Sequence, residues 1–316
     1  LLAKKLRYPA VAYTEGLVSW EKSFARFAIP YPWMASKIEK SAAKAKTVVI
    51  GNLMLDAIKP SLSPTELRGT IGNHSGPGLL LAPGSRPAHF HYMLGFFIKA
   101  AEKMREILPT LTPAVSISPF VTERQIRAAL ASPGAQEWGL TAVYVSYHCE
   151  KCSWQKGEPI GEIQLKDGLK ILCFQHHQYD LMNWADLALT IPGTNTIELA
   201  YMGVPMIVTV PLNHPEEIPL EGPAGLIGGI PFLGKALKKR LLPKFHAKIK
   251  YTAWPNRLAN ELVVPELIGR LTPAEVARTA VRMLKDQGEL LHTSQHLQKL
   301  VGTSGAARRL VGLLQE

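Results

Sequence analysis

Two short turns in this chain combine small residues with hydrogen-bonding side chains, a combination suited to holding a phosphate group. They are "LLLAPGSR" (Leu79–Arg86) and "LALTIPGTNTIE" (Leu187–Glu198). In each, a strand-like apolar run leads through a Pro-Gly turn into a helical pattern. The first turn of a helix offers unbonded N–H groups and a partial positive charge, so both segments are candidate phosphate sites.

The side chains in these turns suit different parts of a diphosphate. Gly193 lets a phosphate approach the backbone closely, and the polar residues 194–196 can donate hydrogen bonds. Arg86 adds a guanidinium, whose planar fork matches phosphate oxygens. A purely structural alternative stays open, because Asn195 and Glu198 are also spaced as an N-cap and N3 pair that simply begins a helix.

The elements around the turns predict an α/β fold with a parallel sheet covered by helices on both faces. Strand and helix patterns alternate after residue 78, and a helix is predicted from about Ala88 to Leu108 by apolar residues at three- and four-residue steps. The predicted strands after the first turn are "AVSIS", "TAVYVSY", "LKILCFQ", "DLALTI" and "MIVTV". In a parallel sheet both turns lie at the carboxyl edge, where open α/β folds bind ligands.

Composition limits the class of protein. The 316 residues include 47% hydrophobic residues, enough for a packed core, and carry a net charge of +11, which favours an anionic partner. Three cysteines suit a reducing compartment, and no apolar run approaches the roughly 18 residues of a membrane span. Nucleic acid is not expected as a partner, since the charge comes without a binding motif or an arginine and aromatic stripe.

Two further segments have alternative interpretations. Residues 225–250 join a short apolar piece to a basic cluster, which predicts either contact with an anionic membrane surface or an ordinary solvated loop. The segments His148–Cys152 and Cys173–His177 can be written as a zinc pattern containing Cys149 and Cys152. Cys173 falls within a predicted strand, where a buried small hydrophobe is the alternative, and we expect no metal.

Three segments occur together in the order and approximate spacing of one family. They are "LLLAPGSR", "ADLALTIPGTNTIELAYMGVPMIV" and "YTAWPNRLANELVVPELI". The chain thereby resembles the lipid-A-disaccharide synthases, inverting glycosyltransferases of family GT19 with the GT-B fold, which use a UDP-linked acylated glucosamine. The segment "AYTEG…IPYPWM…VVIGNLMLD" resembles the end of that family's first domain, and "GTSGAARRL" resembles its closing helix.

The resemblance implies a role for each matching residue. Arg86 matches the family's essential arginine, expected at the donor diphosphate and its leaving group, and Glu198 matches an acid expected near the ribose. Asn256 matches the asparagine of an "LPN" motif, and Glu261 matches the acid that closes it. The substrate-binding residues implied are Gly84, Ser85, Gly193, Thr194, Asn195, Thr196, Glu198, Asn256 and Glu261.

The resemblance also implies a division of the chain. Residues 1–72 would be the end of an N-terminal acceptor domain and a linker, residues 73–270 a Rossmann-like nucleotide-sugar domain, and residues 271–316 helices that pack back on the first domain. The family's general base and acceptor loop would lie upstream of Leu1. A chain that truly began there would bind nucleotide weakly and transfer nothing.

These expectations combine into one function. The chain would be a hexosyltransferase that moves an acylated glucosamine from a UDP-sugar to a lipid-linked sugar, with no metal or other cofactor. We expect it at the cytoplasmic face of the inner membrane as a peripheral protein, and as a homodimer. Departures at Pro192, Asn195 and "GNL" (Gly51–Leu53) leave two alternatives. These are another UDP-sugar enzyme of the same fold, such as a glycolipid transferase or an epimerase, and an inactive sugar-nucleotide-binding protein.

Overall fold

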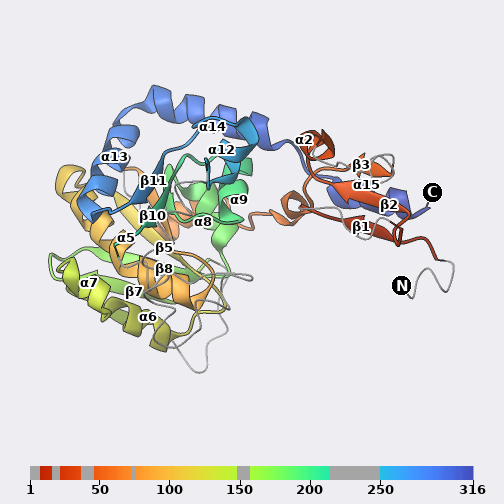
Figure 1. Cartoon of the computed structure of the whole chain (residues 1–316). Coiled ribbons are helices and arrows are strands. Elements are labelled where there is room, and N and C mark those ends of the chain that lie inside the picture. The colour runs from red at the N-terminus through yellow and green to blue at the C-terminus, as the bar shows by residue number, and fades with distance from the viewer. Residues whose placement is uncertain are drawn as a thin grey trace, which may run out of the picture. The chain divides into compact units, whose positions relative to one another are not determined.

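The computed structural model describes residues 8–15, 22–36, 46–72, 76–147, 157–213 and 250–315. It divides into two compact units, one of Leu1–Lys59 with Gly302–Glu316 and one of Pro60–Val301 (Figure 1). Each unit has its own sheet, and the larger unit contains both phosphate-binding candidates.

The larger unit is built on a mostly parallel sheet that has, within the described residues, eight strands in the order β11-β10-β9-β4-β5-β8-β7-β6. Neighbours from β11 to β8 pair in parallel, while β7 pairs antiparallel with both β8 and β6. The strands are β4 (Gly78–Ala82), β5 (Thr112–Ile117), β6 (Ala142–Ser146), β7 (Gly161–Leu165), β8 (Lys170–Gln175), β9 (Leu187–Thr190), β10 (Met206–Pro211) and β11 (Glu266–Gly269). The predicted fold class is confirmed, and the antiparallel edge is an addition to it.

The antiparallel edge arises from a turn too short for a crossover helix. Strand β7, which sequence patterns did not predict, is joined to β8 by a few residues that include Gly168 at φ +87°. A tight turn with a residue at positive φ joins antiparallel neighbours, whereas parallel strands need a connection of a dozen or more residues.

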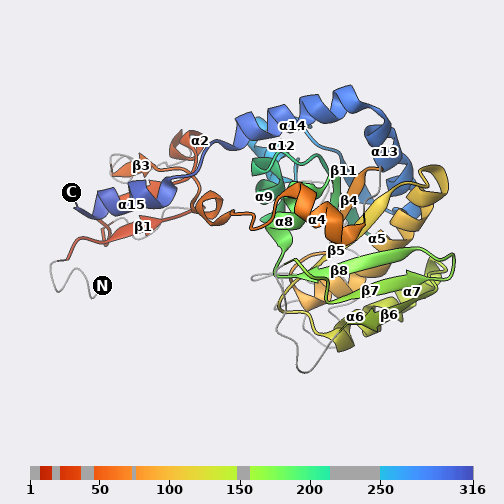
Figure 2. The same ribbon diagram turned by 180° about the vertical axis from the view of Figure 1, so that it is seen from behind.

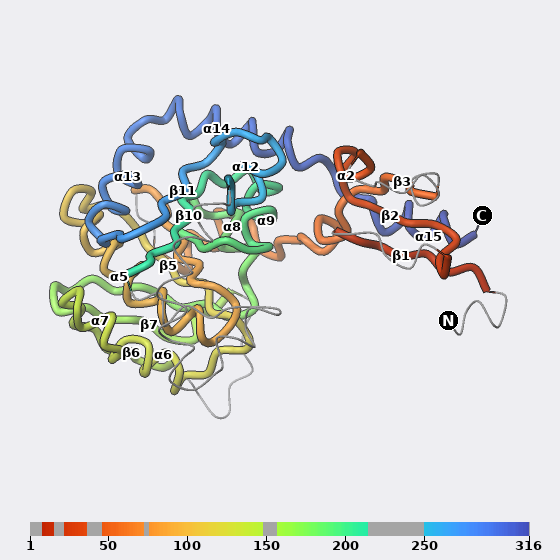
Figure 3. Tube along the Cα trace, viewed as in Figure 1, coloured from red at the N-terminus to blue at the C-terminus, as the bar shows by residue number. Residues whose placement is uncertain are grey.

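Helices cover both faces of this sheet (Figures 1 and 2). On one face α5 (Pro87–Ile107) packs against α6 (Glu123–Leu130), α7 (Pro133–Glu137) and α13 (Pro273–Lys285). On the other, α8 (Gln178–Trp184) contacts β4, β5 and α4 (Pro64–Ile71). Figure 3 shows α9 (Asn195–Tyr201) with α12 (Trp254–Ala259) and α14 (Gln287–Val301) beside it, as their contacts require.

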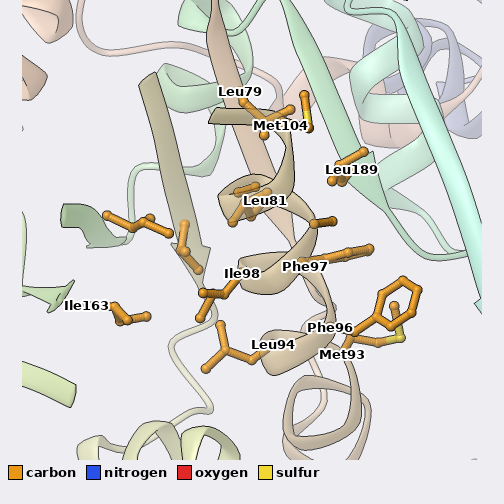
Figure 4. Packing of buried hydrophobic residues seen from close by; sticks show 14 of the residues in the cluster. Leu79, Leu81, Met93, Leu94, Phe96, Phe97, Ile98, Met104, Ile163 and Leu189 are labelled. Carbon is orange, nitrogen blue, oxygen red and sulfur yellow. The ribbon is translucent and has the colours of Figure 1, made fainter. Parts of the chain in front are cut away.

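The core between α5 and the sheet follows the predicted helical spacing. Leu94 and Phe97 of α5 are buried against Leu79 and Leu81 of β4 (Figure 4). Phe90 of α5 is buried in the same cluster. All five residues of β4 are buried, as is typical of a central parallel strand with helices on both faces. This buried strand carries the first candidate turn at its carboxyl end.

The smaller unit holds a three-stranded parallel sheet and a closing helix. Strands β1 (Val11–Tyr13), β2 (Arg26–Ile29) and β3 (Thr47–Val49) pair in that order within the described ranges, next to the short helices α2 (Pro32–Ser36) and η1 (Leu53–Ala57). The start of α15 (Ala306–Gln315) is held by Asp56, whose carboxylate accepts the backbone N–H groups of Gly305 and Ala307. Arg309 donates to the Ile50 carbonyl at 2.6 Å, so α15 is tied to this sheet.

The unit boundaries fall at 59/60 and 301/302, whereas the sequence placed divisions at 72/73 and 270/271. Contacts explain where the intervening helices belong. Helix α4 contacts α8, α13 contacts α5, and α14 contacts α9, so all three are part of the larger unit. Among the residues that the structure describes, no helix is both long and apolar enough to cross a membrane.

Asp180 anchors the start of the larger unit. Its carboxylate accepts the N–H groups of Ser61 and Leu62, the Ser61 hydroxyl at 2.9 Å and the His177 Nδ1 at 2.9 Å. Because His177 Nε2 accepts the Gly157 N–H, the ring proton lies on Nδ1 and points at Asp180. Burial opposes ionisation of Asp180, but these hydrogen bonds outweigh it and hold its pKa below the usual value.

This anchor predicts an acid-sensitive contribution to stability. A carboxyl with a lowered pKa stabilises the fold fully above its ordinary pKa of about 3.9 and loses that contribution as pH falls through the lowered value. Asp180→Asn places an amide donor against the His177 N–H, so we expect about 2–3 kcal/mol less stability at pH 7. Thermal unfolding from pH 7 to pH 3 measures this, and the variant should show a flatter acid limb. Asp167→Asn, at an exposed hairpin turn, is the control, and equal curves for both variants would contradict the assignment.

Candidate functional site

A cavity of about 620 Å³ lies at the carboxyl edge of the large sheet, within the larger unit. Its wall combines the turns after β4 and β9, the end of β5 and the first residues of α8 and α12. The lining residues are Ala82, Gly84, Ser85, Arg86, His89, Ser116, Ile117, Ser118, Pro119, Phe120, Gln178, Met182, Ile191, Pro192, Gly193, Thr194, Asn195, Glu198 and Trp254. The structure therefore brings both candidate turns into one cavity of a size typical for small-molecule sites.

The turn after β4 is shaped by Gly84. Its φ is +105°, and an added Cβ would lie 2.6 Å from the Ile191 Cδ1 of the other turn. Only glycine satisfies both the backbone conformation and this close approach. Arg86 follows as the N-cap of α5, is exposed and lines the cavity. The turns after β4 and β9 are thus in contact, and the guanidinium of Arg86 lies beside them.

His89 is a lining residue that the sequence analysis did not single out. It lies three residues after Arg86, on the first turn of α5, and is half-buried. Burial and then the positive charge of Arg86 lower its pKa, so the imidazole is neutral at neutral pH and can donate one hydrogen bond and accept another. The sequence signal for His89 was its position one helical turn after Arg86, which places both residues at the same end of the helix.

The capping alternative for the second turn is wrong. The N-cap of α9 is Thr194, which makes no side-chain capping bond. Asn195 instead donates through Nδ2 to the hydroxyl of Thr190, and Glu198 accepts a hydrogen bond from the Tyr179 hydroxyl at 3.2 Å. Glu198 is one of the residues that line the cavity, and its carboxyl is bonded to Tyr179 rather than to the helix start.

Burial raises the pKa of Glu198, and the Tyr179 hydrogen bond opposes that rise. A half-buried carboxyl beside a cavity with a raised pKa is a common feature of functional sites. Tyr179 is another residue absent from the sequence predictions, because only the packing of α8 beside the cavity brings it to Glu198.

Thr196 has a structural position, although it was predicted to face the ligand. It is fully buried, donates to the Gly193 carbonyl at 2.8 Å and accepts the Trp254 N–H at 3.2 Å. Its hydroxyl therefore fixes the turn and ties α12 to it. Gly193, Thr194 and Asn195 do line the cavity.

Asn256 and Glu261 do not line the cavity, contrary to their predicted places in the site. Asn256 is fully buried; its amide donates to the Val264 carbonyl and to Glu266, and its oxygen accepts the N–H groups of Val263 and Val264. These four bonds use the whole hydrogen-bonding capacity of the side chain, which leaves none for a ligand. Glu261 is exposed on the surface.

Glu266 is the acid that organises this segment. It accepts the N–H groups of Thr252 and Ala253 as well as the Asn256 amide, and so holds the residues that lead into α12. The "PN" motif and this acid thus fix the start of α12, whose first residue, Trp254, lines the cavity. The segment contributes to the site through Trp254, a residue that the sequence analysis did not select.

Helix starts differ systematically between the cavity and the rest of the unit. Among the helices that the structure describes, α4, α6, α7 and α13 begin with a side-chain cap, from Ser63, Thr122, Ser132 and Thr272 respectively. The four helices whose first residues or N-caps line the cavity, α5, α8, α9 and α12, have no side-chain capping bond. At α5, α8 and α9 the first N–H groups therefore lack the usual side-chain partner where a ligand can reach them, whereas the Trp254 N–H of α12 already donates to the Thr196 hydroxyl.

The long helix α5 is the strongest anion site of the four. Its first helical amide bond is that of Phe90 to the Arg86 carbonyl, so the N–H groups of Ala88 and His89 lie at its open end. With 21 residues it carries a full dipole, whose positive end lies at the cavity beside Arg86. Helix α9 is too short for a comparable dipole and contributes hydrogen-bonding groups instead.

The described part of the chain contains no candidate metal site that matches the zinc pattern. There, no three His, Cys, Asp or Glu residues gather as a metal site, and Cys173 is buried, with a pKa raised by that burial. His177 is bonded to Asp180, and His176 is exposed. Cys149, Cys152 and the basic segment 225–249 lie outside the described residues.

Comparison with curated proteins confirms the resemblance read from the motifs. The lipid-A-disaccharide synthase of Geobacter sulfurreducens is 24% identical over 296 residues, covering 92% of this chain and 62% of that protein. That of Gluconobacter oxydans is 27% identical over 262 residues, covering 79% and 49%. The chain thus spans less than two thirds of the length of these relatives. No family model matches it.

Comparison with solved structures agrees with the fold class. Staphylococcus aureus MnaA, solved with UDP, matches with a TM-score of 0.53 at 14% identity, covering 99% of this chain and 70% of that protein. At this identity the likeness concerns the fold alone. It supports the predicted GT-B-type α/β architecture.

Substitutions at Asn256 and Glu261 should show that Asn256 contributes to the stability of the fold and that Glu261 does not. Asn256→Ala removes four buried hydrogen bonds and should lower the free energy of unfolding by about 3 kcal/mol. Glu261→Ala, an exposed neighbour in the same motif, should change it by less than about 0.5 kcal/mol. Chemical denaturation of both variants measures this. A fully stable Asn256→Ala protein would show that the buried network is not what holds α12.

Proposed function

We propose that the cavity binds the diphosphate of a UDP-sugar and that the chain is the nucleotide-sugar half of a glycosyltransferase. The carrying observation is the set of uncapped helix starts around one cavity with Arg86 at its edge. Such a set of N–H donors and a guanidinium suits a doubly charged diphosphate. Neither core packing nor helix capping requires these groups to face one cavity. The similarity to lipid-A-disaccharide synthases supports the same function.

In this function the chemistry of the site is electrostatic. As the bond between sugar and diphosphate breaks, negative charge develops on the leaving UDP. Arg86, the amides of Ala88 and His89 and the turn at Gly193–Asn195 would stabilise that charge without reorganising. The neutral His89 can donate to a phosphate oxygen. We propose no metal for the reaction, since these groups supply the charge stabilisation that a metal would give.

The finer assignment follows the relatives. We propose an inverting transfer of an acylated glucosamine to a lipid-linked sugar, as in a lipid-A-disaccharide synthase. The acceptor site and the general base would be supplied by sequence upstream of Leu1. A lipid substrate places the reaction at a membrane surface, so we also propose peripheral contact at the cytoplasmic face through residues 225–250. Homodimerisation belongs to the same proposal.

Arg86 provides the first test of the diphosphate site. Arg86→Gln should weaken UDP binding about tenfold, because a charge-assisted bidentate contact to phosphate is lost. Arg105→Gln is the matched control; it lies on the same helix about 28 Å away, from the 1.5 Å rise per residue, and should bind like wild type. Isothermal titration calorimetry with UDP and with pyrophosphate measures both variants.

The outcomes of that titration discriminate between the proposals. No binding of UDP by the wild-type protein at millimolar ligand would refute the nucleotide site. UDP binding without transfer, measured on a chain that includes the upstream sequence, would identify an inactive sugar-nucleotide-binding protein. Epimerisation of a UDP-sugar without any acceptor would identify another enzyme class.

Glu198 provides a test that depends on pH. A carboxylate accepts hydrogen bonds from ribose hydroxyls, whereas a carboxylic acid accepts them less well, so UDP affinity should increase as pH rises through the raised pKa of Glu198. Glu198→Gln should bind UDP about tenfold less tightly and lose this pH dependence, while pyrophosphate binding stays unchanged. Titrations from pH 4.5 to pH 7.5 measure it. Identical pH profiles for variant and wild type would exclude Glu198 as a nucleoside contact.

A further inference from the structure

We infer that the indole ring of Trp254 is a platform on which the donor sugar packs. The cavity would hold the diphosphate at its two turns and the pyranose ring against Trp254. This inference rests on the proposed function, because it takes the bound diphosphate as its starting point. It assigns a role in sugar specificity to a residue that stands where the related motif has leucine.

Hydrogen bonds place Trp254 next to the diphosphate turn. The Trp254 N–H donates to the Thr196 hydroxyl at 3.2 Å, and that hydroxyl donates to the Gly193 carbonyl at 2.8 Å. Trp254 is therefore linked to the turn through the Thr196 side chain, and it is itself one of the residues that line the cavity. A group bonded directly to the diphosphate is within reach of the indole.

Arg257 fixes the orientation of the ring. Its guanidinium carbon lies 4.4 Å from the centroid of the Trp254 ring, which is a cation–π contact. The contact covers one face of the indole, so a ligand can meet only the other face or the edge. A ring held in this way loses little conformational entropy when a ligand packs on it.

The backbone that carries Trp254 is also held in place. Glu266 accepts the N–H groups of Thr252 and Ala253, the two residues that precede Trp254. The buried Asn256 connects the first turn of α12 to Glu266 and to Val264. The hydrogen bonds of Glu266 and Asn256 therefore hold the backbone that positions the Trp254 side chain.

The surroundings of Trp254 favour a sugar over the other parts of the donor. A pyranose ring presents apolar C–H groups on its faces and hydroxyls around its rim, and therefore suits an aromatic face bordered by polar groups. The neighbouring turn supplies such groups through Gly193, Thr194 and Asn195. An acyl chain would need a continuous apolar path instead. The nucleoside has a separate candidate contact in Glu198, held by Tyr179.

The test compares affinities for UDP and UDP-N-acetylglucosamine on wild type, Trp254→Leu, Trp254→Tyr and Trp138→Leu. Leucine keeps an apolar side chain at a position where the related motif has it, and tyrosine keeps an aromatic face. Trp138 packs against Phe96 and controls for the same chemical change away from the cavity. Thermal unfolding of each variant identifies any loss of folding.

We expect Trp254→Leu to shift the ratio of the two dissociation constants about fivefold against the sugar nucleotide, the size of one aromatic contact. Trp254→Tyr should restore most of the ratio, and Trp138→Leu should leave it at the wild-type value. An unchanged ratio in Trp254→Leu, or an equal weakening of both ligands, overturns the inference while leaving the UDP site intact. If wild type fails to bind UDP, the proposed function itself has failed.

Discussion

The parallel pairing of β4 with β9 is the constraint on which the site depends. These strands are more than a hundred residues apart in the chain, yet they pair in register from Leu79 with Leu187 to Ala82 with Thr190. Because both strands run in the same direction, their following turns emerge side by side at one edge of the sheet. Gly84, at φ +105°, then lets its turn pass close to Ile191, whose Cδ1 would lie 2.6 Å from an added Cβ. A shift in the register of β4 with β9 would move the two turns apart, and the cavity between them would be lost.

The cavity edge is stabilised differently from the rest of the unit. Away from the cavity, α4, α6, α7 and α13 begin with Ser or Thr caps, which satisfy the first amides locally. At the cavity α5, α8 and α9 have no such cap, and the site is held rigid by contacts between elements. Thr196, Asn256 and Glu266 link α9, α12 and β11 by part-buried hydrogen bonds. The site thus keeps its donors available and still has a fixed shape.

Charge in the site is arranged to match a polyanion at neutral pH. Burial and the field of Arg86 lower the pKa of His89, so this imidazole adds a hydrogen-bond donor without a second full charge. Glu198 lies in the same cavity with a raised pKa, so the carboxylate form, which accepts hydrogen bonds from a ribose, is gained as pH rises. The dipole of α5 adds positive potential at the same edge. The positive groups at the start of α5 thus suit the phosphates, and Glu198 provides a separate polar contact suited to a ribose.

The amino-acid sequence by itself determined the alternation of elements, the apolar face of α5 and the two glycine turns. These features depend on neighbours within a few residues, through helical periodicity and turn chemistry. Tertiary structure decided which polar groups remain free to bind. Thr196 and Asn256 belong to the right motifs, but their bonding capacity is used by residues from other elements. Packing between distant elements likewise brought Trp254 to the cavity, because a hydrogen-bond partner across the fold leaves no local pattern in the sequence.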